Sequence, residues 1–354
     1  MTNLFFITIT GILLGCLSLW GFKYLPGERW QMMAIVPMAK HGDSSHWRGA
    51  NLTYYGFFIA TSQLLAIALL LILLGAMEIS LAGTTLATIM LLAVCLPAAR
   101  IVAMIVEKKR HTFTVGGASF VGIILAPLAI QAAGIICSRF GDCYLPMMPV
   151  LAAMAIAYSL GEGLGRLACL SYGCCYGKPL RECSPLIQSI FKRTGVIFYG
   201  NTKKAEYESH LAGERLVPIQ AITCMLYTTT ALLGCWLFLH SHFTVTLVLC
   251  MTVTQVWRLL SEMLRADFRG FGKVSVYQKM GAIAVIYTIG LALVNKSLGT
   301  LVAATPSISH GLHSLWNPGV IIGLQLAWLI FFIYFGRSTV TCSTVSFTLL
   351  EERI

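Results

Sequence analysis

Charged residues are scarce in this chain. Only 11% of its 354 residues are Asp, Glu, Lys or Arg, whereas 57% are hydrophobic. Average soluble domains carry about 25% charged residues. This scarcity excludes an ordinary soluble domain and predicts a protein that crosses the membrane several times.

Sequence motifs of soluble enzymes are missing as well. There is no P-loop, no Gly-x-Ser-x-Gly and no His-Glu-x-x-His. Because paired Cys-x-x-Cys spacings are also lacking, we predict no metal site and no cofactor. No repeat of aromatic and basic residues suggests a nucleic acid partner, so the net charge of +11 points to anionic lipid head groups instead.

The twelve cysteines do not form a disulfide framework by their spacing. Cys137 and Cys143 flank a short loop and could be bridged, while Cys174, Cys175 and Cys183 share another loop. The cysteines that lie within apolar runs are most simply small core residues; they are Cys16, Cys95, Cys224, Cys235 and Cys250.

What the chain does contain is a series of apolar runs, each about 20 residues long, as a bilayer requires. These nine candidate spans lie at 4–22, 53–77, 84–106, 115–136, 146–168, 217–239, 243–262, 277–295 and 319–336. We therefore expect an all-α integral membrane protein.

The chain divides into three parts. Residues 1–51 form an extra N-terminal helix and an interfacial segment, residues 52–295 form a seven-helix core, and residues 296–354 form an extra helix and tail. Residues 177–216 are polar and basic and predict a small cap outside the membrane. Cys16 follows a lipobox-like Leu-Leu-Gly, but no Lys or Arg precedes it, so we expect a retained helix.

The segment from Tyr158 to Pro179 combines charges, glycines and paired cysteines inside an apolar chain. Glu162 and Arg166 are four residues apart and share one helix face. Charges within a membrane span are costly and mark functional sites. The alternative is a structural ion pair at a helix end, followed by a tight turn.

A second charged face occurs near the end of the seventh span. Arg258, Glu262 and Arg265 recur at helical spacing. Two arginines from separate spans suit a phosphodiester, because each guanidinium group can donate two parallel hydrogen bonds to phosphate oxygens. A carboxylate four residues away would hold each arginine in place.

Strict alternation of the spans places the loops at 107–114, 169–216 and 263–276 on one side of the membrane. The glycines Gly116 and Gly117 open to the same side and could serve close helix packing or offer backbone N–H groups to a head group. Tyr55, at the start of a span, could belong to an aromatic belt at the interface or to this site.

These residues resemble the motifs of the bacterial prolipoprotein diacylglyceryl transferase family. Its members are integral enzymes that move a diacylglyceryl group from phosphatidylglycerol to a cysteine of a lipoprotein precursor. The resemblance covers residues 52–285 in order. It consists of Tyr55, Gly116-Gly117-Ala118-Ser119-Phe120, Gly165-Arg166, Gly173, Gly177, Pro218-x-Gln220, Arg258-x-x-x-Glu262-x-x-Arg265 and Met280-Gly281.

The chain departs from the family at three positions. Val121 stands where the family has a histidine important for activity. Cys169 and Cys174 replace an asparagine and a glutamate of the family's signature. The resemblance therefore supports a lipid-binding transferase scaffold more strongly than it supports lipoprotein modification.

The resemblance implies a membrane transferase that uses a phosphatidylglycerol-like donor, with a lipoprotein precursor or another acceptor as partner. Arg166 and Arg258 would clamp the lipid phosphate, oriented by Glu162 and Glu262. The thiols of Cys174 or Cys175 would activate the acceptor or carry the lipid briefly; a close-packed turn, or a disulfide to Cys169 or Cys183, is the alternative for this pair. The expected substrate-binding residues are Tyr55, Gly116, Gly117, Ser119, Glu162, Cys169, Gly173, Gly177 and Arg265.

Two further functions remain open. A lipid-binding or lipid-moving protein without catalysis is favoured by the loss of the histidine at Val121. A membrane thiol redox protein is suggested by the adjacent cysteines, although they lack the Cys-x-x-Cys geometry.

Two arguments disagree on the orientation in the membrane. The resemblance implies a multi-pass protein of the bacterial cytoplasmic (inner) membrane whose site faces the periplasm, and we expect this orientation. The positive-inside rule predicts the reverse, because the side with the charged loops carries most Lys and Arg residues.

Overall fold

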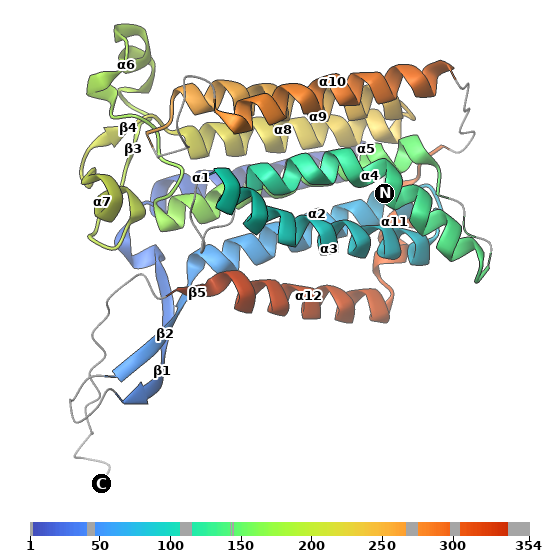
Figure 1. The fold of residues 1–354 in the computed structure, drawn as a ribbon, viewed down its shortest axis with the longest axis horizontal. Coiled ribbons are helices and arrows are strands. Elements are labelled where there is room, and N and C mark those ends of the chain that lie inside the picture. The colour runs from blue at the N-terminus through green and yellow to red at the C-terminus, as the bar shows by residue number, and fades with distance from the viewer. Residues whose placement is uncertain are drawn as a thin grey trace.

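Nine long apolar helices make up most of the computed structural model, which describes residues 3–40, 47–106, 115–141, 143, 145–266, 275–297 and 305–338. They run along one common direction (Figure 1). The all-α membrane fold and the nine predicted spans are thus confirmed within the described residues. The helices are α1 (Asn3–Tyr24), α2 (Tyr54–Gly75), α3 (Leu81–Val106), α4 (Val115–Ser138), α5 (Met147–Tyr172), α8 (Ile219–Leu239), α9 (Phe243–Met263), α10 (Val276–Ser297) and α12 (Pro318–Gly336).

The predicted loop at 107–114, most of the loop at 263–276 and the tail at 339–354 lie outside the described residues. Of the two additional long helices, α1 packs against α8 and α5, and α12 packs against α2.

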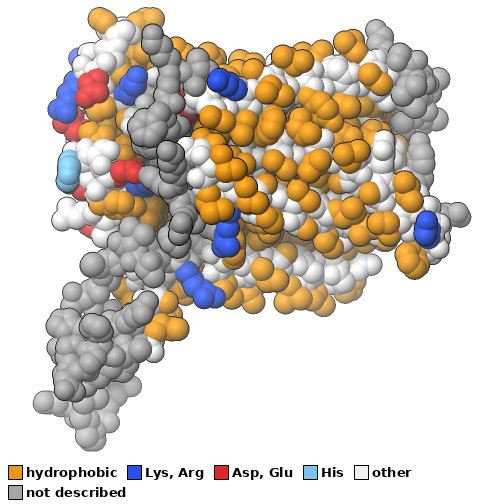
Figure 2. Space-filling view, viewed as in Figure 1, with side chains coloured by type: hydrophobic (Ala, Val, Ile, Leu, Met, Phe, Trp, Pro, Cys, Tyr) orange, Lys and Arg blue, Asp and Glu red, His pale blue; other side chains and the backbone are white. Residues whose placement is uncertain are grey.

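The flanks of the bundle are apolar, and the charges gather at one end. Figure 2 shows hydrophobic side chains spread over the side of the bundle. Leu128, Ile286 and Leu293 are examples of large residues that remain mostly exposed there. A helix bundle in lipid needs this arrangement, because its outer surface meets hydrocarbon rather than water.

Helix α5 is the centre of the bundle. It packs against α2, α8 and α9, and its middle is buried more completely than that of any other described span. Small residues make this possible: a Cβ at Gly161 would lie 3.1 Å from Cβ of Ala66, and a Cβ at Gly163 would lie 3.1 Å from Cβ of Tyr227. Charged residues on α5 must therefore find partners on neighbouring helices.

A small cap covers the end of the bundle where α5 finishes; we call this the cap end (Figure 1). The buried amino group of Lys203 fastens the cap, because its Nζ donates to the carbonyl oxygens of Leu25 and Ser171. The cap consists of the 3-10 helix η2 (Leu180–Glu182), α6 (Pro185–Phe191), β3 (Val196–Ile197), α7 (Lys204–Ser209) and β4 (Arg215–Leu216).

The segment between α1 and α2 contains strands, which the sequence analysis did not predict. After the 3-10 helix η1 (Glu28–Trp30), β1 (Met32–Lys40) pairs antiparallel with β2 (Trp47–Thr53), and β5 (Arg337–Ser338) extends this sheet. At its edge the backbones of Gly56 and Gly336 touch, since a Cβ at Gly56 would lie 2.1 Å from Cα of Gly336. The sheet thus ties α12 to the start of α2.

The opposite end of the bundle is simpler. Cys137, in the last turn of α4, forms a disulfide with Cys143 in the connection to α5, as their spacing allowed. The short helix α11 (Ile308–Leu315) packs against α2 there. In sequence, the connections at this end and the adjoining last turns hold only two of the chain's 25 Lys and Arg residues, Arg139 and Lys296.

Candidate functional site

Two arginines from different helices meet on one carboxylate inside the bundle. Oε2 of Glu162 accepts hydrogen bonds from Nη2 of Arg166 at 2.9 Å and from Nη2 of Arg258 at 2.8 Å. Arg166 lies one turn above Glu162 on α5, whereas Arg258 reaches it from α9. The structure therefore brings together the two guanidinium groups that the sequence placed on separate spans.

Arg258 is held on a second side by hydroxyl groups. Its Nη1 donates to Oγ of Ser119 at 2.8 Å, and its Nη2 donates to the hydroxyl of Tyr158 at 3.1 Å. Gln255 also donates to the Tyr158 hydroxyl. The sequence analysis did not select Tyr158 or Gln255, although their spacing of four and three residues from Glu162 and Arg258 was a usable signal.

The glycines before Ser119 have a packing role. A Cβ at Gly116 would lie 2.9 Å from the Tyr277 ring and 3.4 Å from Nη1 of Arg258, and a Cβ at Gly117 would lie 2.4 Å from Val102. Helix α4 can therefore approach α3 and α10 closely enough for Ser119 to reach Arg258. Of the two interpretations of these glycines, the contacts support close helix packing.

The prediction that Glu262 holds Arg258 in place is wrong. Glu262 does not pair with Arg258 but with Arg265, at 3.7 Å. Arg258 points toward α5, where Glu162 lies. Glu262 lies in the last turn of α9, and Arg265 follows the end of that helix. Spacing along one helix could not show this, because the contact that decided it crosses between helices.

The charges of this group do not cancel. Two guanidinium groups share one carboxylate oxygen, and the buried Nε of Arg166 has no hydrogen-bond partner among the described residues. An unsatisfied buried donor costs about 1–3 kcal/mol. The group is therefore suited to an anionic ligand that would supply both charge and an acceptor.

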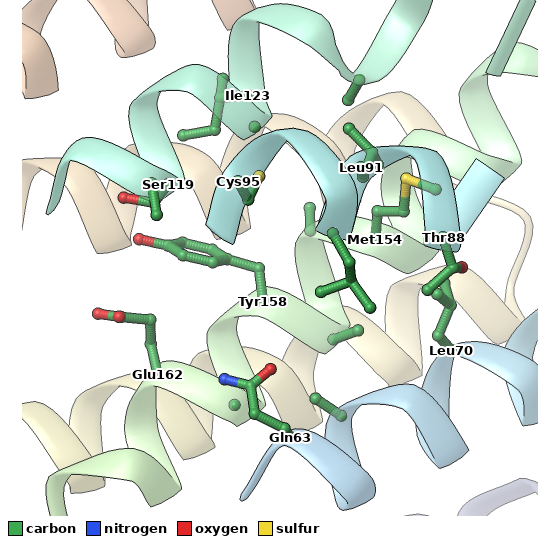
Figure 3. A pocket seen from close by; sticks show the side chains of 18 of the residues that line it. Gln63, Leu70, Thr88, Leu91, Cys95, Ser119, Ile123, Met154, Tyr158 and Glu162 are labelled. Carbon is green, nitrogen blue, oxygen red and sulfur yellow. The ribbon is translucent and has the colours of Figure 1, made fainter. Parts of the chain in front are cut away.

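An apolar cavity of about 350 Å³ adjoins this group. Its walls come from α2, α3, α4, α5, α9, α10 and α12. Ser119, Tyr158 and Glu162 extend their polar atoms at one end, while Leu91, Met154 and other apolar side chains lie farther along (Figure 3). A molecule with an anionic head and a hydrocarbon tail matches this division.

Three cysteines converge just beyond Arg166. The sulfur atoms of Cys169, Cys174 and Cys175 all lie within 4.8 Å of one another. Helix α5 ends with Gly173 in the left-handed conformation, at φ +74°, and the N–H groups of Gly173 and Cys174 both donate to the Cys169 carbonyl. This turn folds the chain back, so that residues five and six positions after Cys169 return to its side.

The loop that carries Cys174 and Cys175 is fixed by its neighbours. Nε2 of the buried Gln220 donates to the carbonyl of Cys174, and Gly177 pairs with Arg265 in an isolated β-bridge. A Cβ at Gly177 would lie 2.3 Å from the carbonyl oxygen of Val217. Close backbone contact therefore accounts for glycine at 177.

The electrostatic environment favours a thiolate at Cys175. Hydrogen bonds from the thiols of Cys169 and Cys174, together with the positive charges of Arg265 and Arg166, lower the pKa of Cys175 well below 9.0. Cys175 also has a positive φ of 56°, which is uncommon for a residue with a side chain. Cys183 lies apart from this cluster and donates to the Pro179 carbonyl.

One further expected residue, Tyr55, lies beside these groups. Tyr55 packs against Tyr172, with ring centroids 5.5 Å apart, and lies close enough to the cysteines to interact with their charges. It is half-buried beside the site rather than on the outer surface. Val121 lies on α4 two residues past Ser119 and offers no proton-transferring group.

Comparison with known proteins finds one family. Residues 45–294 match the model of a family described as prolipoprotein diacylglyceryl transferase. No curated protein and no solved structure matches the chain.

Proposed function

Since this chain belongs to the prolipoprotein diacylglyceryl transferase family, we propose that it transfers a diacylglyceryl group from an anionic, phosphatidylglycerol-like phospholipid to an acceptor. The observation that carries this proposal is the pair Arg166 and Arg258 on the single carboxylate of Glu162, next to an apolar cavity. The pair is suited to a phosphate, and the cavity is suited to acyl chains.

The arginines would act on the leaving group. In the transfer, the bond between a glycerol carbon and the phosphate oxygen breaks, and the departing glycerol phosphate takes the electron pair. Fixed guanidinium donors stabilise this developing charge more in the transition state than in the bound lipid. Glu162 keeps both donors in position, and Ser119 and Tyr158 hold Arg258 from its other side.

The remaining expected residues would shape the head-group region. Glu262 and Arg265 form a second charged pair, close enough to Arg258 and Cys175 to influence them electrostatically. Gly116, Gly117, Gly173 and Gly177 allow close backbone approach there, and Tyr55 borders the cysteines. Cys169, Cys174 and Cys175 would serve the acceptor, as activating groups or as transient carriers.

A direct assay tests the proposal. Full-length protein in vesicles that contain labelled phosphatidylglycerol should release glycerol phosphate when a cysteine-containing lipobox peptide is supplied. Glu162→Gln should abolish release, while the matched Glu78→Gln, at an exposed carboxylate away from the cavity, should retain it to within a few-fold. Unchanged lipid under these conditions would leave the transferase proposal without support.

A second candidate function is lipid binding without catalysis, and Val121 is the observation that favours it. In the same assay, phosphatidylglycerol that co-purifies with the protein but is never cleaved would establish this alternative. Reductant-dependent alkylation of the three clustered cysteines, without any lipid turnover, would support the thiol redox alternative instead.

We further propose the bacterial inner membrane as the location, with the cap end at the periplasm, as in the family. The reverse orientation is favoured by two observations: few Lys and Arg residues lie at the opposite end, and the Cys137–Cys143 disulfide lies there. Cys183, on the cap, decides between them. A membrane-impermeant maleimide should label Cys183 in cells with a permeabilised outer membrane, and Cys183→Ser should lose this label. Labelling of Cys183 only after lysis would establish the reverse orientation.

A further inference from the structure

The three clustered thiols have a geometry that sequence spacing concealed. Their sulfur atoms lie within 4.8 Å of one another. Thiolates bound to one tetrahedral zinc ion are about 3.8 Å apart, given Zn–S bonds of about 2.3 Å. Shifts of less than about 1 Å would therefore place all three sulfurs on one ion. The absence of Cys-x-x-Cys, from which we predicted no metal site, misses this arrangement because α5 ends between the ligands.

Contacts within the chain hold the backbone around the thiols in place. Cys169 is fixed on the last turn of the buried helix α5, and the loop with Cys174 is held by its backbone bonds to Cys169 and Gln220. Oε1 of Gln220 is buried and has no hydrogen-bond partner among the described residues. The same amide group donates to the Cys174 backbone, so an acceptor without a partner lies next to the cysteine loop.

The surrounding charge fits a metal–thiolate centre. A divalent ion with three thiolates carries a net charge of −1. Arg166 and Arg265 act electrostatically on Cys175 and would stabilise this negative charge, while each keeps its own carboxylate partner. A disulfide, by contrast, would use two of the three sulfurs and leave the third without a role.

We propose that Cys169, Cys174 and Cys175 bind one zinc ion through three thiolates, with the fourth position open to the acceptor thiol. Three protein ligands and an open position are typical of catalytic zinc sites. The part that concerns the acceptor rests on the proposed transferase function; the metal site itself does not.

The zinc ion would promote deprotonation of the acceptor thiol. Val121 cannot do this, because its side chain carries no proton-accepting group. A thiol that coordinates zinc loses its proton, which passes to solvent. The resulting sulfur would attack the glycerol carbon of the donor lipid, a C–S bond would form, and the C–O bond to phosphate would break. Glycerol phosphate would leave toward Arg166 and Arg258, and no electrons would be exchanged with the metal.

Metal binding can be measured without lipid. Full-length reduced protein, stripped with chelator and titrated with Zn²⁺ alone, should bind one ion per chain. Zinc should also protect Cys169, Cys174 and Cys175, but not Cys183, from alkylation in the unaltered protein. Cys174→Ser should lose stoichiometric binding, and the matched Cys183→Ser should keep it.

The results separate the two proposals. Zinc far below one equivalent, or equal binding by the Cys174→Ser and unaltered proteins, overturns the site. Stoichiometric zinc without any glycerol phosphate release leaves the site and removes the transferase function. Undiminished lipid transfer in chelated Cys169→Ser protein leaves the transferase function and overturns the role of zinc in activating the acceptor.

Discussion

The two ends of the bundle are held together by different kinds of contact. At the cap end, ionisable side chains are buried and depend on partners from other segments: Arg258 of α9 on Glu162 of α5, and Lys203 of the cap on the carbonyl groups of Leu25 and Ser171. At the opposite end, short connections and the Cys137–Cys143 disulfide close the bundle with few charges. The difference indicates where chemistry takes place, because buried charges are retained at a cost.

The largest expected effect tests the arginine pair. Arg258→Met should lower lipid transfer by about 10²–10³-fold, because a fixed donor to the developing phosphate charge is lost. Glu162 keeps Arg166, but the hydroxyl groups of Ser119 and Tyr158 lose their donor, so stability should fall by about 1–3 kcal/mol. Glycerol phosphate release and thermal unfolding in detergent measure the two effects. The matched Arg139→Met at the opposite end should change neither; equal losses in both variants would contradict the comparison.

Substitution of one glycine at each end tests the same difference between the two ends. Gly177→Ala should lower transfer by about tenfold and stability by about 1–3 kcal/mol, because the new Cβ collides with the Val217 carbonyl and displaces the cysteine loop. A Cβ at Gly134, near the opposite end of α4, meets no atom within 4 Å. Gly134→Ala should therefore be neutral or slightly stabilising. Parallel transfer and unfolding measurements on the two variants are the check, and a neutral Gly177→Ala would contradict it.

The buried lysine makes cap stability depend on pH. Burial lowers the pKa of Lys203 from 10.5 to about 7, with partial opposition from Glu28. Between these values the folded chain binds fewer protons than the unfolded chain, so cap stability should rise as the pH increases from 7 toward 10.5. At pH 9, Lys203→Met should weaken the cap by about 1–3 kcal/mol, because two carbonyl groups lose their donor.

Hydrogen exchange in the cap, measured at several pH values, gives the dependence of cap stability on pH. Lys203→Met should flatten it and lower transfer by only a few-fold, while the neighbouring Lys204→Met should keep the slope of the unaltered protein. A slope that survives Lys203→Met would assign the pH dependence to another group.

The smallest effect on transfer is expected at the disulfide. Cys137→Ser should cost no more than about 2 kcal/mol of stability, because the closed loop is short. Transfer should stay within twofold, since the bridge lies at the end away from the arginines. Release of glycerol phosphate by the variant measures this, and a tenfold loss would show that the two ends are coupled.

The sequence alone predicted much of the fold because a membrane span is a local property. Each apolar run is long enough to be recognised by itself, and Glu162 and Arg166 share a helix face by spacing alone. The strands β1 and β2 were missed, since their pairing depends on a partner strand and on the end of α12. Glu262 was assigned to the wrong arginine because helical spacing allows it to pair with Arg258 or with Arg265, and the contact between Arg258 and Glu162 crosses between helices.

What the sequence determined by itself is the membrane class, the order of the nine spans and the identities of the charged and thiol residues, because hydrophobicity and helical spacing act over short stretches of chain. Only the tertiary structure decided that Arg258 shares a carboxylate with Arg166, that Ser119 and Tyr158 join them beside a cavity, and that three sulfurs meet. Residues about 100 positions apart are brought together by close packing between helices, and glycine backbones set how near those helices come.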